Sequence, residues 1–187
     1  MKRFILIFLL LFSSICYSQN NSDSIIYWDN EYKLDCFDFR NVIQDTAKNI
    51  TAISMVGIKT KGFWNNNLPD YMIYATFDRY ASWNKDTTCS IIAHEQLHFD
   101  IAELYARKLR KQVSELRQDY NDNIQDYQDA IAHIFKEWMQ TDSTYDEETH
   151  HGVYNSKQKE WNAKIATKIE KLKIYKVDYI EYIKKHD

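Results

Sequence analysis

The residues of this chain that are best suited to chemistry lie in the segment His94-Glu95-Gln96-Leu97-His98. On a helix, side chains four positions apart lie one turn above each other, so His94 and His98 present two imidazoles to the same point. Two imidazoles in this arrangement are typical zinc ligands, and Glu95 projects beside them, where it can accept a proton from a water molecule that the zinc activates. This HExxH spacing is the pattern of metalloproteases. The alternative interpretation is a pair of surface histidines on an amphipathic helix.

A catalytic zinc site needs a third protein ligand, and the helix that carries HExxH does not supply one. The extended metzincin pattern is excluded because Ile101 stands where that pattern has glycine and Leu104 where it has histidine. The segment 145–152 contains two histidines and three carboxylates, and it ends at a glycine that permits close approach of the backbone. We therefore expect the third ligand in this segment. The candidates are His150, His151 and Asp146.

The elements that position these residues follow from the pattern of apolar side chains. Only three glycines and one proline occur in 187 residues, which predicts long uninterrupted elements. Apolar residues that are β-branched or alternate with polar ones predict strands over residues 50–58 and 71–80, with turn-forming residues at 61–70 between them. A further strand is expected near residues 25–27 or 32–37.

Three helices are expected in the second half of the chain. The first covers residues 88–111, including the HExxH motif, with Asp86-Thr87-Thr88 as capping residues. The other two, over residues 112–140 and 156–184, have an apolar residue every three to four positions, which is typical of a helix with one buried face. A polar loop is expected at 141–154. Strands followed by helices predict an α+β fold: a small N-terminal antiparallel β-sheet, then the HExxH helix and two long helices, in a zincin-like arrangement.

Residues 1–18 have the pattern of a secretory signal peptide. Two basic residues precede an apolar run at 4–12 that is too short to span a bilayer, and small residues follow it. We therefore expect a single domain over residues 19–187, in a secreted or periplasmic protein with no stable membrane insertion. The alternative is that the N-terminal segment is retained as an anchor.

The composition of the remaining chain excludes several classes of partner. Without Lys2 and Arg3 it has 22 basic and 27 acidic side chains, so it offers no electrostatic surface for nucleic acid or for an anionic membrane. Its two cysteines, Cys36 and Cys89, can pair in an oxidising compartment or remain buried thiols, and both alternatives stay open.

Longer strings of residues resemble one bacterial family more specifically than HExxH does. They are Ser82-Trp83, the run His94–Glu103 followed by Tyr105-Ala106-Arg107, and the run Tyr145–Gly152 followed by Gln158 and Trp161. Together with Asp38-Phe39 they resemble the domain of unknown function 922 family, whose members are expected from the motif to be secreted zinc-dependent proteases. The resemblance implies a peptidase-type activity. It also favours His151 over His150 as the third ligand, because the recurring form is T-x-H-G.

These observations predict a zinc-dependent, metallopeptidase-like hydrolase with a peptide or protein as its substrate. Zn²⁺ is expected to be held by His94, His98 and His151, and Glu95 is expected to act as the general base in hydrolysis of an amide bond. The alternative function is that of a non-catalytic zinc-binding envelope protein whose long helices bind a partner. The same helices could form a homodimer.

Overall fold

The computed structural model describes residues 24–42, 50–86 and 90–179 of the chain. Its elements follow the expected order, with strands before helices. They are β1 (Ile25–Tyr27), the 3₁₀ turn η2 (Cys36–Asp38), β2 (Ala52–Asn65), β3 (Leu68–Asn84), α1 (Ile92–Gln118), α2 (Ile124–Thr149), α3 (Asn155–Lys171) and the 3₁₀ turn η3 (Lys173–Tyr175). The predicted α+β class, with a small antiparallel sheet followed by helices, is confirmed.

The sheet has the strand order β1-β3-β2, and β3 pairs antiparallel with both neighbours. β2 and β3 form a long hairpin in which Asn65 pairs with Leu68 across a two-residue turn. Asn66 and Asn67 both have positive φ (53° and 61°), as a type I′ hairpin turn requires, and asparagine adopts this conformation more readily than most residues. The turn is therefore much shorter than the predicted segment 61–70, because the strands extend into it.

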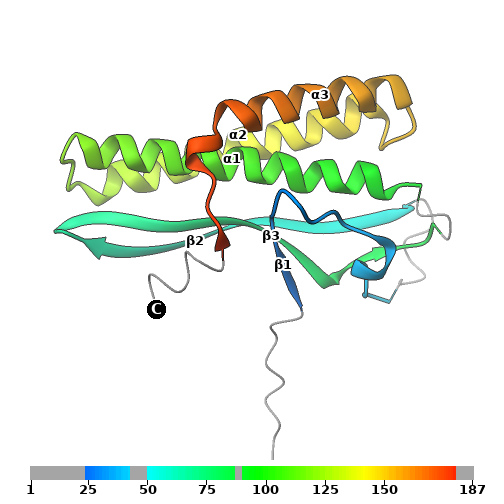
Figure 1. Ribbon diagram of the computed structural model, residues 1–187, viewed down its shortest axis with the longest axis horizontal. Helices are drawn as coiled ribbons and strands as arrows, with labels where there is room; N and C mark the ends of the chain where they lie inside the picture. The colour runs from blue at the N-terminus through cyan, green and yellow to red at the C-terminus, as the bar shows by residue number, and fades with distance from the viewer. Residues whose placement is uncertain (1–23, 43–49, 87–89, 180–187) are drawn as a thin grey trace, which may run out of the picture.

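The helices lie on one face of this sheet. Figure 1 shows α1 directly against the sheet, with α2 and α3 packed on the side of α1 that faces away from it. α1 is consequently buried on several sides, and five of its apolar residues are at most 1% exposed. These residues are Ile101, Ala102, Leu104, Ala106 and Leu109. The HExxH motif thus lies on the central element of the fold, which the sheet and the other helices hold in place.

The boundary between the first two helices differs from the predicted one. α1 continues to Gln118, and the chain turns at residues 119–123. There the side chain of Asn123 accepts a hydrogen bond from the backbone N–H of Gln125 and caps α2. The break expected at residue 112 is wrong because apolar residues continue at helical spacing through that position. The start of α2 is instead determined by its cap at Asn123.

The polar loop expected at 141–154 is also wrong. α2 runs to Thr149, so the connection to α3 contains only residues 150–154. Tyr145 and Thr149 lie four positions apart and are both fully buried. The pattern was misleading because the inward face of this part of α2 carries polar side chains that have partners inside the protein, in place of apolar ones.

The last helix is shorter than predicted. α3 ends at Lys171, and the chain then passes through η3 to the sheet, where Tyr179 stacks on Tyr27 of β1. Figure 1 shows this segment descending from the end of α3 past the sheet. The remainder of the expected helix, at 180–184, lies outside the described residues.

A buried charge cluster joins α1 to α3. The Glu103 carboxylate accepts hydrogen bonds from Arg107 Nε at 2.8 Å and from Arg110 Nη2 at 2.9 and 2.8 Å. The three side chains are 4%, 3% and 7% exposed, respectively. Arg107 Nη1 also donates to the Ile169 carbonyl on α3 at 3.0 Å. An acidic and a basic residue four apart usually form a surface pair, whereas here they help to fix one helix against another.

Some predictions fall on residues that the structure does not describe. The signal peptide expected at 1–18 lies there, and so does Cys89. Cys36 is disulfide-bonded, and it lies in η2 and not in a strand over 32–37. Within residues 24–42, 50–86 and 90–179, the structure contains no helix of the length and apolarity needed to cross a membrane.

Candidate metal centre

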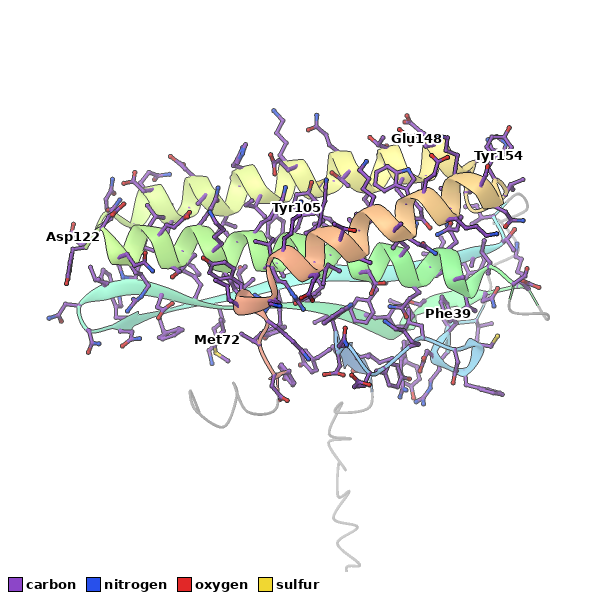
Figure 2. The ribbon with its side chains drawn as sticks, turned by 45° about the horizontal axis from the view of Figure 1, so that its top comes forward. Phe39, Met72, Tyr105, Asp122, Glu148 and Tyr154 are labelled. Atoms are coloured by element: carbon purple, nitrogen blue, oxygen red, sulfur yellow. The ribbon has the colours of Figure 1, made fainter. Side chains whose placement is uncertain are left out.

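The HExxH motif occupies the first two turns of α1, at the end of the molecule where α2 passes into α3. Figure 2 marks this end by Glu148 and Tyr154, and the opposite end by Asp122. A cavity of about 560 Å³ opens here between the start of α1, the last turns of α2 and the first residues of β2. Both histidines and the glutamate of the motif line this cavity.

Three side chains direct ligand atoms to one point in the cavity. Nε2 of His94 lies 3.2 Å from Nε2 of His98, and the two nitrogens lie 3.0 and 3.1 Å from Oδ1 of Asp146 on α2. Among the described residues, His94, His98 and Asp146 form the group able to hold a metal ion. Tetrahedral zinc with ligands at about 2.0–2.2 Å has its ligand atoms about 3.3–3.6 Å apart, a few tenths of an ångström more than the distances found here. The observed spacing therefore fits a metal of this kind.

The ring of His94 is oriented by Gln158 of α3. Oε1 of Gln158 lies 3.2 Å from His94 Nδ1 and accepts a hydrogen bond from the Tyr145 hydroxyl at 2.7 Å. In this orientation of the Gln158 amide, its Nε2 donates to Oδ1 of Asn162 and its Oε1 faces His94. Since Oε1 can only accept, Nδ1 of His94 carries the proton. Its Nε2 lone pair is then directed to the metal position.

The ring of His98 is oriented by Asp142, one turn before Asp146 on α2. Oδ1 of Asp142 lies 2.7 Å from His98 Nδ1, so this nitrogen also carries a proton and Nε2 faces the metal position. Burial by itself lowers the pKa of His98, but the hydrogen bonds to Asp142 and Asp146 outweigh it and raise that pKa to about 10. In the metal-free protein this histidine is therefore a cation at neutral pH.

The carboxylate of Asp146 lies beside Nε2 of both rings. Burial by itself raises the pKa of Asp146, but the adjacent imidazoles of His94 and His98 hold that pKa well below its usual range. The neighbouring phenol of Tyr145 has its pKa raised by burial, so it stays neutral and acts as a donor. Its hydroxyl lies 3.1 Å from the His94 carbonyl as well as 2.7 Å from Gln158. Tyr145 thus positions the histidine and its partner from within the core.

The carboxylate of Glu95 differs from the other acidic groups in the cavity. Glu95 is 6% exposed and lines the cavity next to both histidines. Within the described part of the chain, its carboxylate forms no hydrogen bond and no ion pair. A buried carboxylate that faces a cavity and is not engaged by the protein can accept a proton there.

His151, which the resemblance favours as third ligand, lies at the edge of this arrangement. Its side chain is 76% exposed, and its Nδ1 is 3.5 Å from Oδ1 of Asp146. His150 and His151 both line the cavity. Of the three candidates from the sequence, Asp146 is therefore the one that lies closest to both motif histidines. The assignment of His151 stays a prediction.

Gly152 allows the end of α2 to approach the motif. It has φ +83°, and a Cβ placed on it would lie 3.0 Å from Cβ and Cγ of His94 and from Cδ1 of Ile91. His150 and His151 precede it in the same left-handed conformation, with φ of 51° and 52°. The close approach of backbone that the sequence suggested for this glycine is therefore present, and it is directed at the first motif histidine.

The orienting residues were not found by the sequence analysis as parts of the site. Asp142 was assigned to a loop, and Gln158 entered only through the family resemblance. A usable signal existed, because Asp142 and Asp146 are four apart, as are His94 and His98. Two helices that each present residues at this spacing can match them pairwise when they pack antiparallel.

Comparison with known proteins gives one family. Residues 73–152 match the model of a family described as bacterial protein of unknown function, DUF922. The match confirms the resemblance drawn from the sequence, and it includes the HExxH motif, Asp142, Asp146 and Gly152. Searches among curated proteins and among solved structures found no match.

Proposed function

We propose that this chain, which matches the DUF922 family model over residues 73–152, is an exported zinc-dependent hydrolase of peptide bonds with a zincin-like site. The observation that supports the proposal is the convergence of His94 Nε2, His98 Nε2 and Asp146 Oδ1 within 3.2 Å of one another. The unengaged carboxylate of Glu95 faces the same cavity.

His94, His98 and Asp146 are the residues that would hold the metal, with His151 as the alternative third ligand. Two imidazoles with one carboxylate form a donor set found in catalytic zinc sites. Zinc bound by this set supplies a Lewis acid, which polarises a carbonyl group and lowers the pKa of water. Asp142 and Gln158 keep the two rings in the tautomer that binding requires.

Glu95 is proposed as the general base. Its carboxylate accepts a proton from the attacking water and then donates it to the leaving nitrogen of the cleaved amide. Burial of Glu95 and of both histidines excludes bulk water from around the reacting groups, which strengthens their electrostatic interactions.

The sheet supports a peptide as the substrate. β2 is an edge strand in the order β1-β3-β2, so one of its edges has no strand partner among the described residues. Residues 50–54 and Val56, which lead into this strand and begin it, line the same cavity as the motif. Extended peptides bind to free strand edges through backbone hydrogen bonds. An edge strand beside the metal position therefore suits an extended polypeptide.

The proposal is tested with the variants Glu95→Gln and His94→Ala. Glu95→Gln should bind zinc stoichiometrically, as measured by metal analysis, and lose cleavage of a broad peptide library. His94→Ala should lose both. Turnover in the wild-type protein should stop with a chelator and return with zinc. The hydrolase proposal is wrong if the Glu95→Gln protein cleaves peptides as fast as the wild type. Zinc binding with no turnover in the wild type would favour the non-catalytic zinc-binding protein.

A further inference from the structure

The cavity beside the metal centre has an apolar part that the proposed chemistry does not use. Trp138, Asp142 and Asp146 are spaced by four residues on α2, so they lie on the same face of this helix, and all three line the cavity. The two carboxylates contact the motif histidines. Trp138 lies beyond them, about 12 Å from Asp146 along the helix axis.

The edge strand β2 contributes further apolar side chains to the same cavity. Ile53 and Val56 of β2 line the same cavity as Trp138. The cavity contains no lysine or arginine among its described lining residues, whereas the carboxylates of Glu95, Asp142 and Asp146 all line it. An apolar side chain is therefore favoured in this part, and an acidic side chain is repelled.

The contacts of Trp138 do not explain why a tryptophan is present. Its indole Nε1 is buried and has no hydrogen-bond acceptor among the described residues, an arrangement that destabilises a folded protein. The ring packs edge-to-face against Phe135, with centroids 5.8 Å apart. A phenylalanine could make the same kind of contact without the unpaired donor. The extra aromatic surface that lines the cavity is a reason for the larger residue.

We propose that Trp138, together with Ile53 and Val56 of β2, forms a subsite that binds a large aliphatic or aromatic side chain of the peptide substrate. An extended peptide advances about 3.3 Å per residue, so the subsite takes a side chain within three or four residues of the bond that is cleaved. Trp138 is the specificity-determining residue of this subsite. The inference rests on the proposed function, because it names the substrate class of the same site.

The first test compares cleavage of peptides that carry phenylalanine, alanine or aspartate at each position near the cleaved bond. The wild-type protein should prefer phenylalanine at one position by about tenfold or more in kcat/KM over alanine. Trp138→Ala should remove this preference, and Trp138→Phe should keep most of it. Met139→Ala is the matched control, because Met139 is the next residue on α2 and is 66% exposed. Its preference should equal that of the wild type.

A second variant keeps the test decisive if Trp138→Ala does not fold. Ile53→Lys places a cation in the subsite from the strand side, and it should raise kcat/KM for aspartate-containing peptides relative to phenylalanine-containing ones. Circular dichroism and zinc content establish that each variant is folded and metal-loaded. The subsite is refuted if folded Trp138→Ala, or folded Ile53→Lys, keeps the wild-type preference within twofold.

Binding separates this inference from the hydrolase proposal. The zinc-loaded Glu95→Gln protein is titrated calorimetrically with two peptide hydroxamates, one carrying phenylalanine and one carrying alanine at the preferred position. If the wild type cleaves no peptide, the preferred position is not known, and hydroxamates with phenylalanine or alanine at each position are compared. The phenylalanine compound should bind about tenfold more tightly, and the difference should vanish with Trp138→Ala. Discrimination without wild-type turnover supports the subsite and overturns the hydrolase. Turnover without discrimination supports the hydrolase and overturns the subsite. The absence of both turnover and discrimination overturns both proposals.

Discussion

At the scale of single residues, the candidate site depends on which nitrogen of each imidazole carries a proton. Asp142 and Gln158 accept from Nδ1 of His98 and His94, so both Nε2 atoms face Asp146. Neither orienting residue has to touch a metal ion or a substrate to affect the site. Their influence passes through the histidines, whose orientation and basicity they determine.

The variant Asp142→Asn should bind zinc about 10- to 100-fold more weakly than the wild type. The asparagine is similar in size, but it lacks the charge that holds the Nδ1 proton of His98. Competition with a chromophoric chelator measures the affinity. Asp129→Asn, an exposed position on the same helix, is the control and should bind zinc normally. Equal affinity of the Asp142→Asn and wild-type proteins would show that the carboxylate does not orient the ligand.

Zinc affinity should rise with pH between pH 6 and 8. His98, with its pKa raised to about 10, is protonated throughout this range in the metal-free protein, and it must lose that proton to bind zinc. The affinity should therefore increase by about tenfold per pH unit, and calorimetry in buffers of different ionisation enthalpy should record the released proton. An affinity that is constant from pH 6 to 8 would contradict this account.

At the scale of elements, the site is formed by residues on α1 and α2 and by the end of α2. The four-residue spacing of the histidines on α1 matches that of the two aspartates on α2. The chain then leaves α2 through left-handed residues that end at Gly152, in contact distance of His94. Helix pairing supplies the ligands, and the helix terminus closes the cavity beside them.

Gly152→Ala should destabilise the protein by about 1–3 kcal/mol and weaken zinc binding. The new Cβ would lie 3.0 Å from His94 and Ile91, at a φ of +83° that an alanine rarely adopts. Thermal unfolding and zinc content measure the two effects. Gly57→Ala serves as the matched control, because its Cβ would meet Thr76 Oγ1 at an ordinary 3.4 Å. The explanation fails if both alanine variants unfold at the same temperature.

At the scale of the whole molecule, α1 is held between the sheet and the other two helices. The cluster of Glu103, Arg107 and Arg110 lies at the centre of this packing, and the Arg107 guanidinium also lies over the Trp28 ring, 5.2 Å from its centroid. Trp28 follows β1 and donates from its indole to Asp100 at 2.8 Å. The charged cluster thus connects the strand layer to α3 through the helix that carries the site.

Glu103→Gln should destabilise the fold by about 3–5 kcal/mol, because it leaves two buried arginines without their carboxylate. Urea unfolding measures the change. Glu115→Gln removes the partner of Lys111 in an exposed pair on the same helix, so its expected cost is at most about 0.5 kcal/mol. A similar cost for both substitutions would show that burial does not strengthen the Glu103 cluster.

Local patterns were sufficient to predict several features. The alternation of the strands, the helical spacing of His94 and His98 and the role of Gly152 each depend on neighbours within a few residues, so they can be read from the order of residues. Helix boundaries were less accurate, because Asn123 and the buried polar residues of α2 act through contacts that periodicity does not encode. The α+β order is confirmed, whereas the loop at 141–154 is wrong.

By itself, the sequence determined that two imidazoles and a carboxylate share one turn of a helix, because the helical repeat is a property of the local backbone. Only the tertiary structure decided what meets them. Asp142, Asp146 and Gln158 are 44 to 64 positions away along the chain, and they reach the histidines because α2 and α3 pack on α1. Such packing depends on the burial of many apolar side chains at once, so no short stretch of sequence specifies it.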